Sequence, residues 1–130
     1  MSHCSVGVQP QDLKFKGGTT YLRIGNHNVF REHVTVHRSN TPAEETRIGS
    51  HNYFMQHSHV AHNCALGDHF ILAGGALLAG HVTVEDGAIV GGLAAVRGAA
   101  KAYGSPLWGV SFALGWYRPP VDPSVPNRAR

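Results

Sequence analysis

The sequence predicts an all-β chain, a parallel β-helix of about five coils built from hexapeptide repeats. Three observations support this fold class: an apolar residue at every sixth position, small side chains two positions earlier, and a high glycine content. Neither the 3.6-residue period of a helix nor the two-residue period of a strand produces a spacing of six. In a parallel β-helix each hexapeptide forms one short strand with its turn, and three hexapeptides complete a coil.

The apolar period extends through most of the chain. Its phase reaches back to Val6, which lies three hexapeptides, or one coil, before Ile24. We expect these side chains to point inward and to form the core. The later periodic residues are Phe30, Val36, Ile48, Phe54, Val60, Leu66, Leu72, Leu78, Val84, Val90 and Val96, of which the last nine are consecutive.

Small side chains and glycine suit the narrow cross-section of such a coil. One large and one small inward residue on each face would fill it. Sixteen glycines would supply the left-handed backbone geometry that frequent turns require. An antiparallel sandwich would instead show the hairpin dipeptide Asn-Gly, which the sequence lacks. The small or aliphatic residues two positions before a periodic residue are Cys64, Ala76, Val82, Ala88 and Ala94.

Two polar stretches, residues 8–20 and 38–47, interrupt the repeats but preserve their phase. We interpret both as loops that extend from the coils, where binding groups are often found. After Val96 the apolar pattern fails. We therefore assign residues 1–97 to the β-helix and residues 98–130 to an irregular capping segment with a proline-rich tail.

Composition indicates one globular domain, with 130 residues of which 42% are apolar and 15% charged. A net charge of +3 favours anionic small molecules or an acidic protein partner, and no nucleic-acid-binding motif accompanies it. A short solenoid leaves its end coils exposed, so we expect an oligomer.

The cellular location is predicted from three features of the sequence. Cys4 and Cys64 have neither metal-binding nor redox spacing, which is typical of free thiols in a reducing cytosol. The amino terminus lacks a secretory signal, and no apolar run reaches the ~18 residues of a membrane span. We expect a soluble, cytoplasmic protein.

Five segments together resemble a known family. In order they read QDLK at residues 11–14, REHVTVHR at 31–38, HVAHNC at 59–64, LAGHV at 78–82 and GGLAAV at 91–96. With them the chain resembles the acyl-carrier-protein–UDP-N-acetylglucosamine O-acyltransferases of lipid A biosynthesis, which belong to the hexapeptide-repeat acyltransferase superfamily. The resemblance covers roughly residues 4–96. It implies a left-handed parallel β-helix and a homotrimer with active sites between neighbouring subunits.

The resemblance also implies an activity and roles for individual residues. The activity is transfer of a (hydroxy)acyl chain from acyl carrier protein to the 3-hydroxyl of UDP-N-acetylglucosamine. His62 matches the general base, and Gly80 matches the glycine whose N–H supports the oxyanion. The residues that match substrate-binding positions are Asp12, Lys14, His37, His59 and His81.

The chemistry of acyl transfer agrees with these assignments. Removing a proton from a sugar hydroxyl requires a base with a pKa near neutrality, which imidazole provides. A glycine N–H can donate to the tetrahedral oxyanion without steric obstruction. Direct attack by the hydroxyl needs neither a serine nor a cysteine nucleophile, and no cofactor. His62 and His81 are separated by one coil plus one residue, so we expect them on successive coils, roughly 5 Å apart.

The chain also departs from the family. Asn63 follows the expected base where the family has an acidic residue, and Arg97 stands where the family has a histidine. The resemblance further implies that coils before Cys4, later coils that measure acyl length and a carboxy-terminal helical domain are missing. An inactive or binding-only homologue, truncated at both ends, is therefore the alternative function.

A second alternative is a metal site. His57, His59 and His62 resemble the histidine cluster of trimeric β-helix carbonic anhydrases. Those enzymes pair two histidines five positions apart with a third two coils earlier, and that position here is Tyr21. The pattern is thus incomplete, and we assign no metal. Three further histidines, at outward or turn positions, receive no function: His27, His51 and His69.

Overall fold

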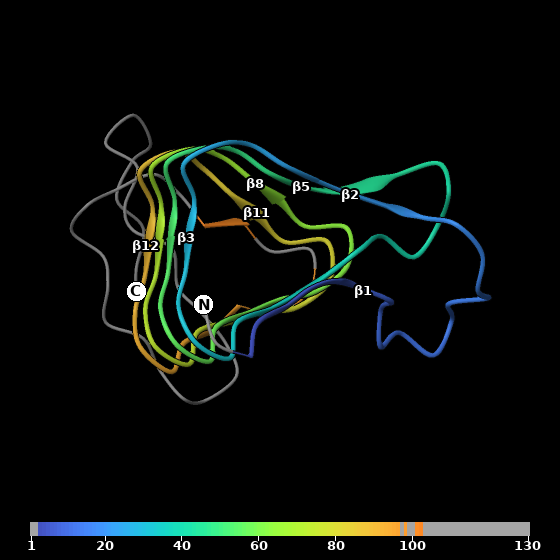
Figure 1. The fold of residues 1–130 in the computed structure, drawn as a ribbon, viewed down its shortest axis with the longest axis horizontal. Helices are drawn as coiled ribbons and strands as arrows, with labels where there is room; N and C mark the ends of the chain where they lie inside the picture. The colour runs from blue at the N-terminus through green and yellow to red at the C-terminus, as the bar shows by residue number, and fades with distance from the viewer. Residues whose placement is uncertain (1–2, 97, 99–100, 103–130) are drawn as a thin grey trace, which may run out of the picture.

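A computed structural model describes residues 3–96, 98 and 101–102, which form a left-handed parallel β-helix (Figure 1). The predicted fold class is confirmed. Viewed along the axis of the β-helix, the three parallel sheets form the sides of a triangle. The predictions for Arg97 and for residues 103–130 lie outside the described residues. Within the described part of the chain there is no helix that could cross a membrane.

Each sheet takes one strand from every coil. Sheet A contains β1 (Ser5–Val8), β4 (Thr35–His37), β7 (His59–Val60), β10 (Leu77–Leu78) and β13 (Ala95–Val96). Sheet B contains β2 (Tyr21–Ile24), β5 (Glu45–Ile48), β8 (Ala65–Leu66), β11 (Thr83–Val84) and β14 (Lys101–Ala102). Sheet C contains β3 (Val29–Phe30), β6 (Tyr53–Phe54), β9 (Ile71–Leu72) and β12 (Ile89–Val90).

The strand register gives the length of a coil. Leu77 pairs with Ala95, three hexapeptides further on, whereas Thr35 pairs with His59, four hexapeptides further on. The longer spacing reflects a loop between β4 and β5. This loop and the one between β1 and β2 project from the corner between sheets A and B, at the right of Figure 1.

The loop predictions need correction at their ends. Val8 belongs to β1, and residues 45–47 belong to β5. Glu45 and Arg47 point outward on β5, so their polarity made a strand resemble a loop. Val6 pairs with Val36 in sheet A, and therefore is not one coil before Ile24, which lies in sheet B.

The β-helix also extends past the predicted boundary at residue 97. Lys101–Ala102 form β14, which pairs with β11. Ala102 keeps the six-residue phase, but alanine is too small to show up in an apolar pattern.

The core consists of periodic residues and of residues two positions before them. All nine from Ile48 to Val96 are at most 5% exposed, and the five small residues two positions before them are buried too. Phe54 stacks on Phe30 with ring centroids 4.5 Å apart and meets Phe70 edge-on at 5.2 Å. Val6 is 44% exposed because it lies on the first described coil.

Histidines occupy many of the left-handed corners. Among the described residues, nine non-glycine residues and five glycines have a positive φ. The corner series His27, His51 and His69 stacks its rings with centroids 4.9 and 5.0 Å apart. The predicted turn positions of these three are confirmed, but most left-handed turns do not use glycine.

Several glycines instead permit close backbone approach. A Cβ on Gly49 or on Gly67 would lie 2.0 Å from an aspartate oxygen of the next coil, Asp68 Oδ1 or Asp86 Oδ1 respectively. These carboxylates accept hydrogen bonds from the backbone N–H of Ser50 and Asp68, at 2.7 Å each. The glycines therefore let one coil cap the next.

Candidate active site

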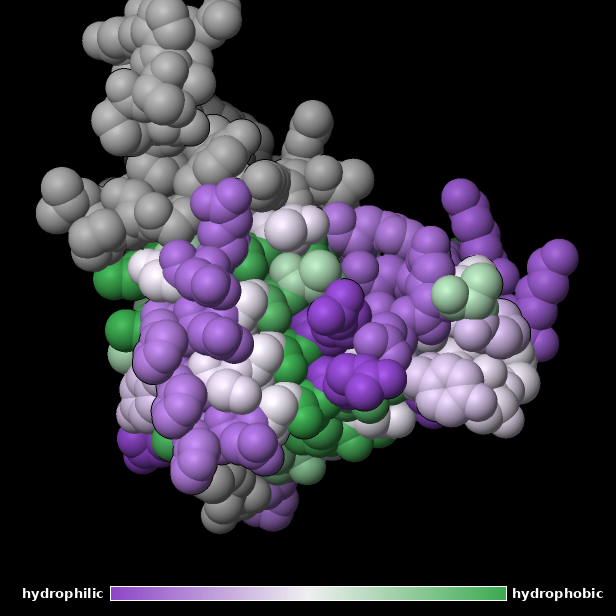
Figure 2. Space-filling model, turned by 90° about the horizontal axis from the view of Figure 1, so that it is seen from above, coloured by the Kyte–Doolittle hydropathy of each residue, from purple (hydrophilic) through white to green (hydrophobic). Residues whose placement is uncertain are grey.

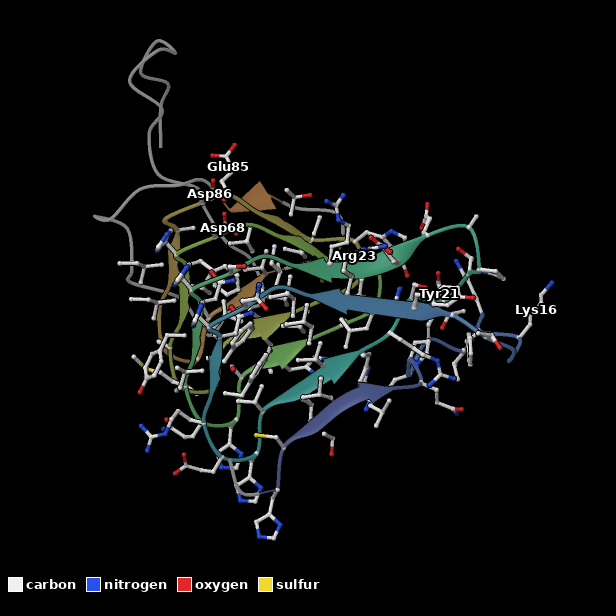
Figure 3. The ribbon with its side chains drawn as sticks, turned by 45° about the horizontal axis from the view of Figure 1, so that its top comes forward. Lys16, Tyr21, Arg23, Asp68, Glu85 and Asp86 are labelled. Atoms are coloured by element: carbon white, nitrogen blue, oxygen red, sulfur yellow. The ribbon has the colours of Figure 1, made fainter. Side chains whose placement is uncertain are left out.

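Two hollows on the outer surface are candidate sites. One, of about 630 Å³, lies over sheet B and includes Arg23 and Arg47. Both guanidinium groups already contact Glu45, at 3.1 and 3.5 Å. Figure 2 shows this face, where strongly hydrophilic side chains adjoin a hydrophobic strip, and Figure 3 shows Arg23 on β2 apart from the acidic group Asp68, Glu85 and Asp86. None of the predicted site residues lines it.

The other hollow is a groove over sheet A that contains most of the predicted site. Its volume is about 470 Å³, and it lies beside the loop between β1 and β2. Histidines and a carboxylate form its polar part, and small or aliphatic residues form its floor. The lining residues are Gln11, Asp12, His37, His59, Ala61, His62, Leu77, Leu78, Ala79, Gly80, Ala95 and Val96.

His62 lies at the corner that follows β7. Its Nδ1 is 3.0 Å from Oδ1 of Asn63, and its Nε2 is 3.7 Å from Oδ2 of Asp12. The His62 side chain is only 15% exposed. The ring is thus held at one nitrogen and presents the other to the groove.

Asp12 comes from the loop between β1 and β2. The backbone N–H of Lys14 donates to Oδ1 at 3.0 Å, and the side-chain amide of Asn40 donates to Oδ2 at 2.8 Å. These hydrogen bonds hold the pKa of Asp12 below its ordinary value, the bond from Lys14 most strongly. An ionised carboxylate therefore faces the nitrogen of His62 that would receive a proton.

His37 and His59 form the inner part of the groove. Their rings meet edge-on with centroids 4.7 Å apart, and Nδ1 of His59 is 2.6 Å from the hydroxyl of Thr35. Burial, and secondarily the charge of His37, lowers the pKa of His59 to about 4. Burial, followed by the charge of His62, also lowers the pKa of His37. Both rings favour the neutral form.

Gly80 lies directly beneath the His62 ring. A Cβ at this position would be 2.5 Å from Cε1 and 2.6 Å from Nε2 of His62, far inside contact distance. Its N–H hydrogen-bonds no group within the described part of the chain. Glycine is therefore required for the position of the imidazole and also offers a donor at the groove.

In this arrangement Nε2 of His62 can accept a proton from a hydroxyl group bound in the groove. The imidazolium formed would face the carboxylate of Asp12, and an oxyanion could accept from the N–H of Gly80. Cys64 cannot serve as a nucleophile in the groove, because it is buried and burial raises its thiol pKa to about 12.

Two predicted residues lie at the margin or outside the groove. The His81 ring meets His62 edge-on at 5.2 Å, the separation that the sequence spacing predicts, but His81 is exposed and does not line the groove. Lys14 contributes its backbone N–H to Asp12, and its side chain is likewise absent from the lining.

The alternative metal cluster is dispersed in the structure. His57 lies at a left-handed corner, where its ring stacks on that of His33 at 4.8 Å. His59 and His62 instead line the groove over sheet A. In the part of the chain that the structure describes, no three histidine, cysteine or acidic side chains form a group that could hold a metal ion.

Sequence reasoning missed two residues that contact the site. Asn40 donates to Asp12, and Glu44 accepts a hydrogen bond from the side-chain amide of Asn63. Both lie between β4 and β5 in a stretch interpreted only as a polar loop. Glu44 could have been found, because it precedes His62 by three hexapeptides, the length of one coil.

Known proteins with similar sequences share one name. No protein-family model matches the sequence. The chain is 40% identical over 126 residues to the acyl-carrier-protein–UDP-N-acetylglucosamine O-acyltransferase of Herminiimonas arsenicoxydans, covering 96% of this chain and 48% of that protein. It is 52% identical over 94 residues to the protein of the same name from Alkalilimnicola ehrlichii, covering 72% and 36%.

Solved structures give the same result. LpxA of Acinetobacter baumannii superposes with a TM-score of 0.75 at 46% identity, covering 77% of this chain and 39% of that one. The UDP-N-acetylglucosamine acyltransferase of Arabidopsis also has a TM-score of 0.75, at 43% identity, with 77% and 36% covered. The predicted resemblance is confirmed. The chain spans about a third to a half of the length of the curated relatives it matches.

Proposed function

We propose that this chain, which is similar to part of the acyl-carrier-protein–UDP-N-acetylglucosamine O-acyltransferases, transfers a (hydroxy)acyl chain from acyl carrier protein to the 3-hydroxyl of UDP-N-acetylglucosamine. This reaction is the first step of lipid A synthesis. The observation that supports it best is the position of His62, with Nε2 open to the groove opposite Asp12 and its ring above Gly80.

Each residue has a proposed role. Nε2 of His62 takes the proton of the 3-hydroxyl as the oxygen attacks the thioester carbonyl, and Asp12 stabilises the resulting imidazolium. The N–H of Gly80 donates to the oxyanion, and collapse of the intermediate breaks the C–S bond. The sulfur that leaves takes the proton from the His62 imidazolium, which releases the carrier thiol and restores the neutral base. His37 and His59 remain neutral and act as hydrogen-bonding groups for the sugar. Lys14 and His81 contact substrate from the margin of the groove.

We also propose a cytoplasmic homotrimer in which a neighbouring subunit completes the groove. The open groove supports this, because acyl transfer benefits from a site that excludes water. The net charge of +3 suits both an acidic carrier protein and an anionic diphosphate. Both cysteines are free, as expected in a reducing compartment.

The direct test uses the full chain with UDP-N-acetylglucosamine and a hydroxyacyl carrier protein, and detects the 3-O-acyl product by mass spectrometry. We expect product from the wild type and a loss of at least 10²-fold in His62→Ala, since a positioned general base contributes about that much. His69→Ala, which removes an exposed corner histidine outside the groove, serves as the control and should leave the rate unchanged.

A binding-only homologue is the second candidate. It is favoured by Asn63, which follows the proposed base where the family has an acidic residue. This candidate predicts that UDP-N-acetylglucosamine binds, as measured by calorimetry, without any product. Light scattering would test the trimer separately, and a monomeric wild type would contradict that part of the proposal.

A further inference from the structure

We propose that Glu44 is a positioning residue that fixes the proton of His62 on Nδ1 by acting through Asn63. The inference rests on the proposed function, because it assigns the orientation of the base in that reaction. Where the family has an acidic residue directly after the base, this chain has Asn63. The carboxylate of Glu44 acts on the base through the side-chain amide of Asn63.

Asn63 is the link between the two residues. Its Oδ1 faces Nδ1 of His62 at 3.0 Å, and its Nδ2 donates to Oε1 of Glu44. A third partner, the backbone N–H of Asn40, donates to the same Oδ1 at 3.0 Å. The amide thus lies between a ring nitrogen, a carboxylate and a backbone donor.

These partners permit only one orientation of the amide. A flip of the Asn63 amide would place its oxygen against the carboxylate of Glu44 and its NH₂ against the N–H of Asn40, so that like groups would meet on both sides. The oxygen must therefore face His62. Because that oxygen can only accept, the neutral imidazole carries its proton on Nδ1 and its lone pair on Nε2.

Glu44 and Asn63 are both held by the fold. The buried Ser39 hydroxyl lies 2.7 Å from the carbonyl oxygen of Glu44 and 3.0 Å from that of Thr41, which closes the end of the loop. The backbone N–H of Asn63 donates to the buried hydroxyl of Thr46 at 2.8 Å. The distance between Glu44 and the amide is therefore set before substrate binds.

In this tautomer the lone pair of His62 lies on Nε2, the nitrogen that faces the groove. Nε2 faces the groove and Asp12, whereas the other tautomer would direct its lone pair at Asn63. Since only the Nδ1–H tautomer can accept the hydroxyl proton from the groove, loss of Glu44 reduces the fraction of enzyme in the reactive state.

The first measurement reads the tautomer and requires no activity. Full-length protein labelled with ¹⁵N-histidine is studied by long-range ¹H–¹⁵N correlation at alkaline pH, and the His62 signals are assigned by their loss in His62→Gln. We expect the Nδ1–H tautomer in the wild type and a mixture of tautomers in Glu44→Ala. Glu45→Ala is the matched control, because Glu45 contacts Arg23 and Arg47 instead.

The second measurement is kinetic and uses rescue. We expect Glu44→Ala to lower kcat about tenfold with little change in KM. In an Asn63→Asp background the new carboxylate accepts directly from Nδ1–H, and Glu44 now repels it. Glu44→Ala should then leave kcat unchanged or raise it. A purely structural role for Glu44 would lower kcat in both backgrounds.

The outcomes separate this inference from the proposed function. If Glu44→Ala leaves the His62 tautomer as in the wild type, the inference is overturned whether or not the protein transfers acyl groups. It is also overturned if Glu44→Ala lowers kcat equally in both backgrounds. If the wild type forms no product but Glu44→Ala still changes the tautomer, the proposed function fails and the proposed role of Glu44 stands.

Discussion

The position of the His62 ring depends on the absence of a side chain at Gly80. The imidazole occupies the volume that a Cβ on Gly80 would need, so the base and the glycine beneath it are one structural unit. A family resemblance assigns Gly80 through its N–H alone. The structure adds a steric requirement, which can be separated from hydrogen bonding because alanine retains the N–H.

At this scale the first prediction concerns Gly80→Ala. The methyl group would displace the His62 ring, and a misplacement of about 1 Å can cost about 100-fold in rate. We expect kcat in the acyl-transfer assay to fall by about that factor while the protein remains folded by circular dichroism. Gly92→Ala is the control, since its Cβ would meet only an ordinary contact at 3.5 Å. Equal rates for the two variants would contradict the steric requirement.

A second prediction at the residue scale concerns His59 and pH. Its pKa is about 4 in the folded chain and 6.5 ordinarily, so the unfolded chain binds the proton first as pH falls. The free energy of unfolding should therefore decrease as the pH falls from about 6.5 to about 4. In this range His59 binds up to one proton more in the unfolded chain than in the folded chain.

Urea unfolding of the wild type and of His59→Gln across this range measures that contribution. The slope of stability against pH should be shallower in the variant, because glutamine takes up no proton on unfolding. Parallel slopes for the two proteins would show that His59 titrates alike in the folded and unfolded states.

At the scale of the element, a corner of the coil depends on buried asparagine. Asn52 is 2% exposed, and its side chain forms two hydrogen bonds: Nδ2 donates to the carbonyl of Gly67, and Oδ1 accepts from the N–H of Phe70. Its backbone N–H donates to the side chain of Asn28. The side chain thus joins one coil to the next where the backbone turns between sheets B and C.

Asn52→Ala should destabilise the fold by roughly 2–4 kcal/mol, because it leaves the buried N–H of Phe70 and the carbonyl of Gly67 without their partner. The measurement is the shift in urea midpoint at a constant m-value. Asn28 makes a matching bond to the carbonyl of Gly49 on an earlier, partly exposed coil. Asn28→Ala should therefore lower the free energy of unfolding by less than Asn52→Ala does. An equal loss of stability in the two variants would contradict the importance of burial.

Elements also differ in how far the sequence could predict them. The period from Ile48 to Val96 identifies one buried apolar residue in every hexapeptide, since each hexapeptide places one such side chain at the same point of the strand. It does not show that β5 begins at Glu45, because the outward residues Glu45 and Arg47 are polar, and it misses β14, where Ala102 is small. Because the polar pattern predicts a loop over β5, it does not place Glu44 one coil below His62.

At the scale of the whole molecule, the candidate site could be predicted mainly where the resemblance supplied it. Asp12, His37, His59, His62 and Gly80 meet in one groove although they are spread over more than half of the chain. Periodicity alone places the histidines on successive coils. It cannot place Asp12, because the conformation of a loop follows from local contacts such as the bond from Asn40 and not from a repeat.

The last prediction concerns stability along the axis. Each coil depends on its neighbours for burial, and Val6 on the first described coil is 44% exposed whereas Val36, its partner on the next coil, is fully buried. Native-state hydrogen exchange should therefore find the amides of β7–β9 at least tenfold more protected than those of β1–β3. Uniform protection along the chain would contradict this, and would indicate that the molecule opens only as a unit.

The constant length of three hexapeptides per turn, from the pairing of Arg47 with Ala65 onward, restricts how such a gene can change in length. Deleting the codons of three hexapeptides from these coils would remove one complete layer and let the layers above and below meet in register. Deleting one codon fewer would move every later side chain by one place, exchanging its buried and exposed faces. Insertions and deletions should thus be tolerated as whole layers, or within the two projecting loops.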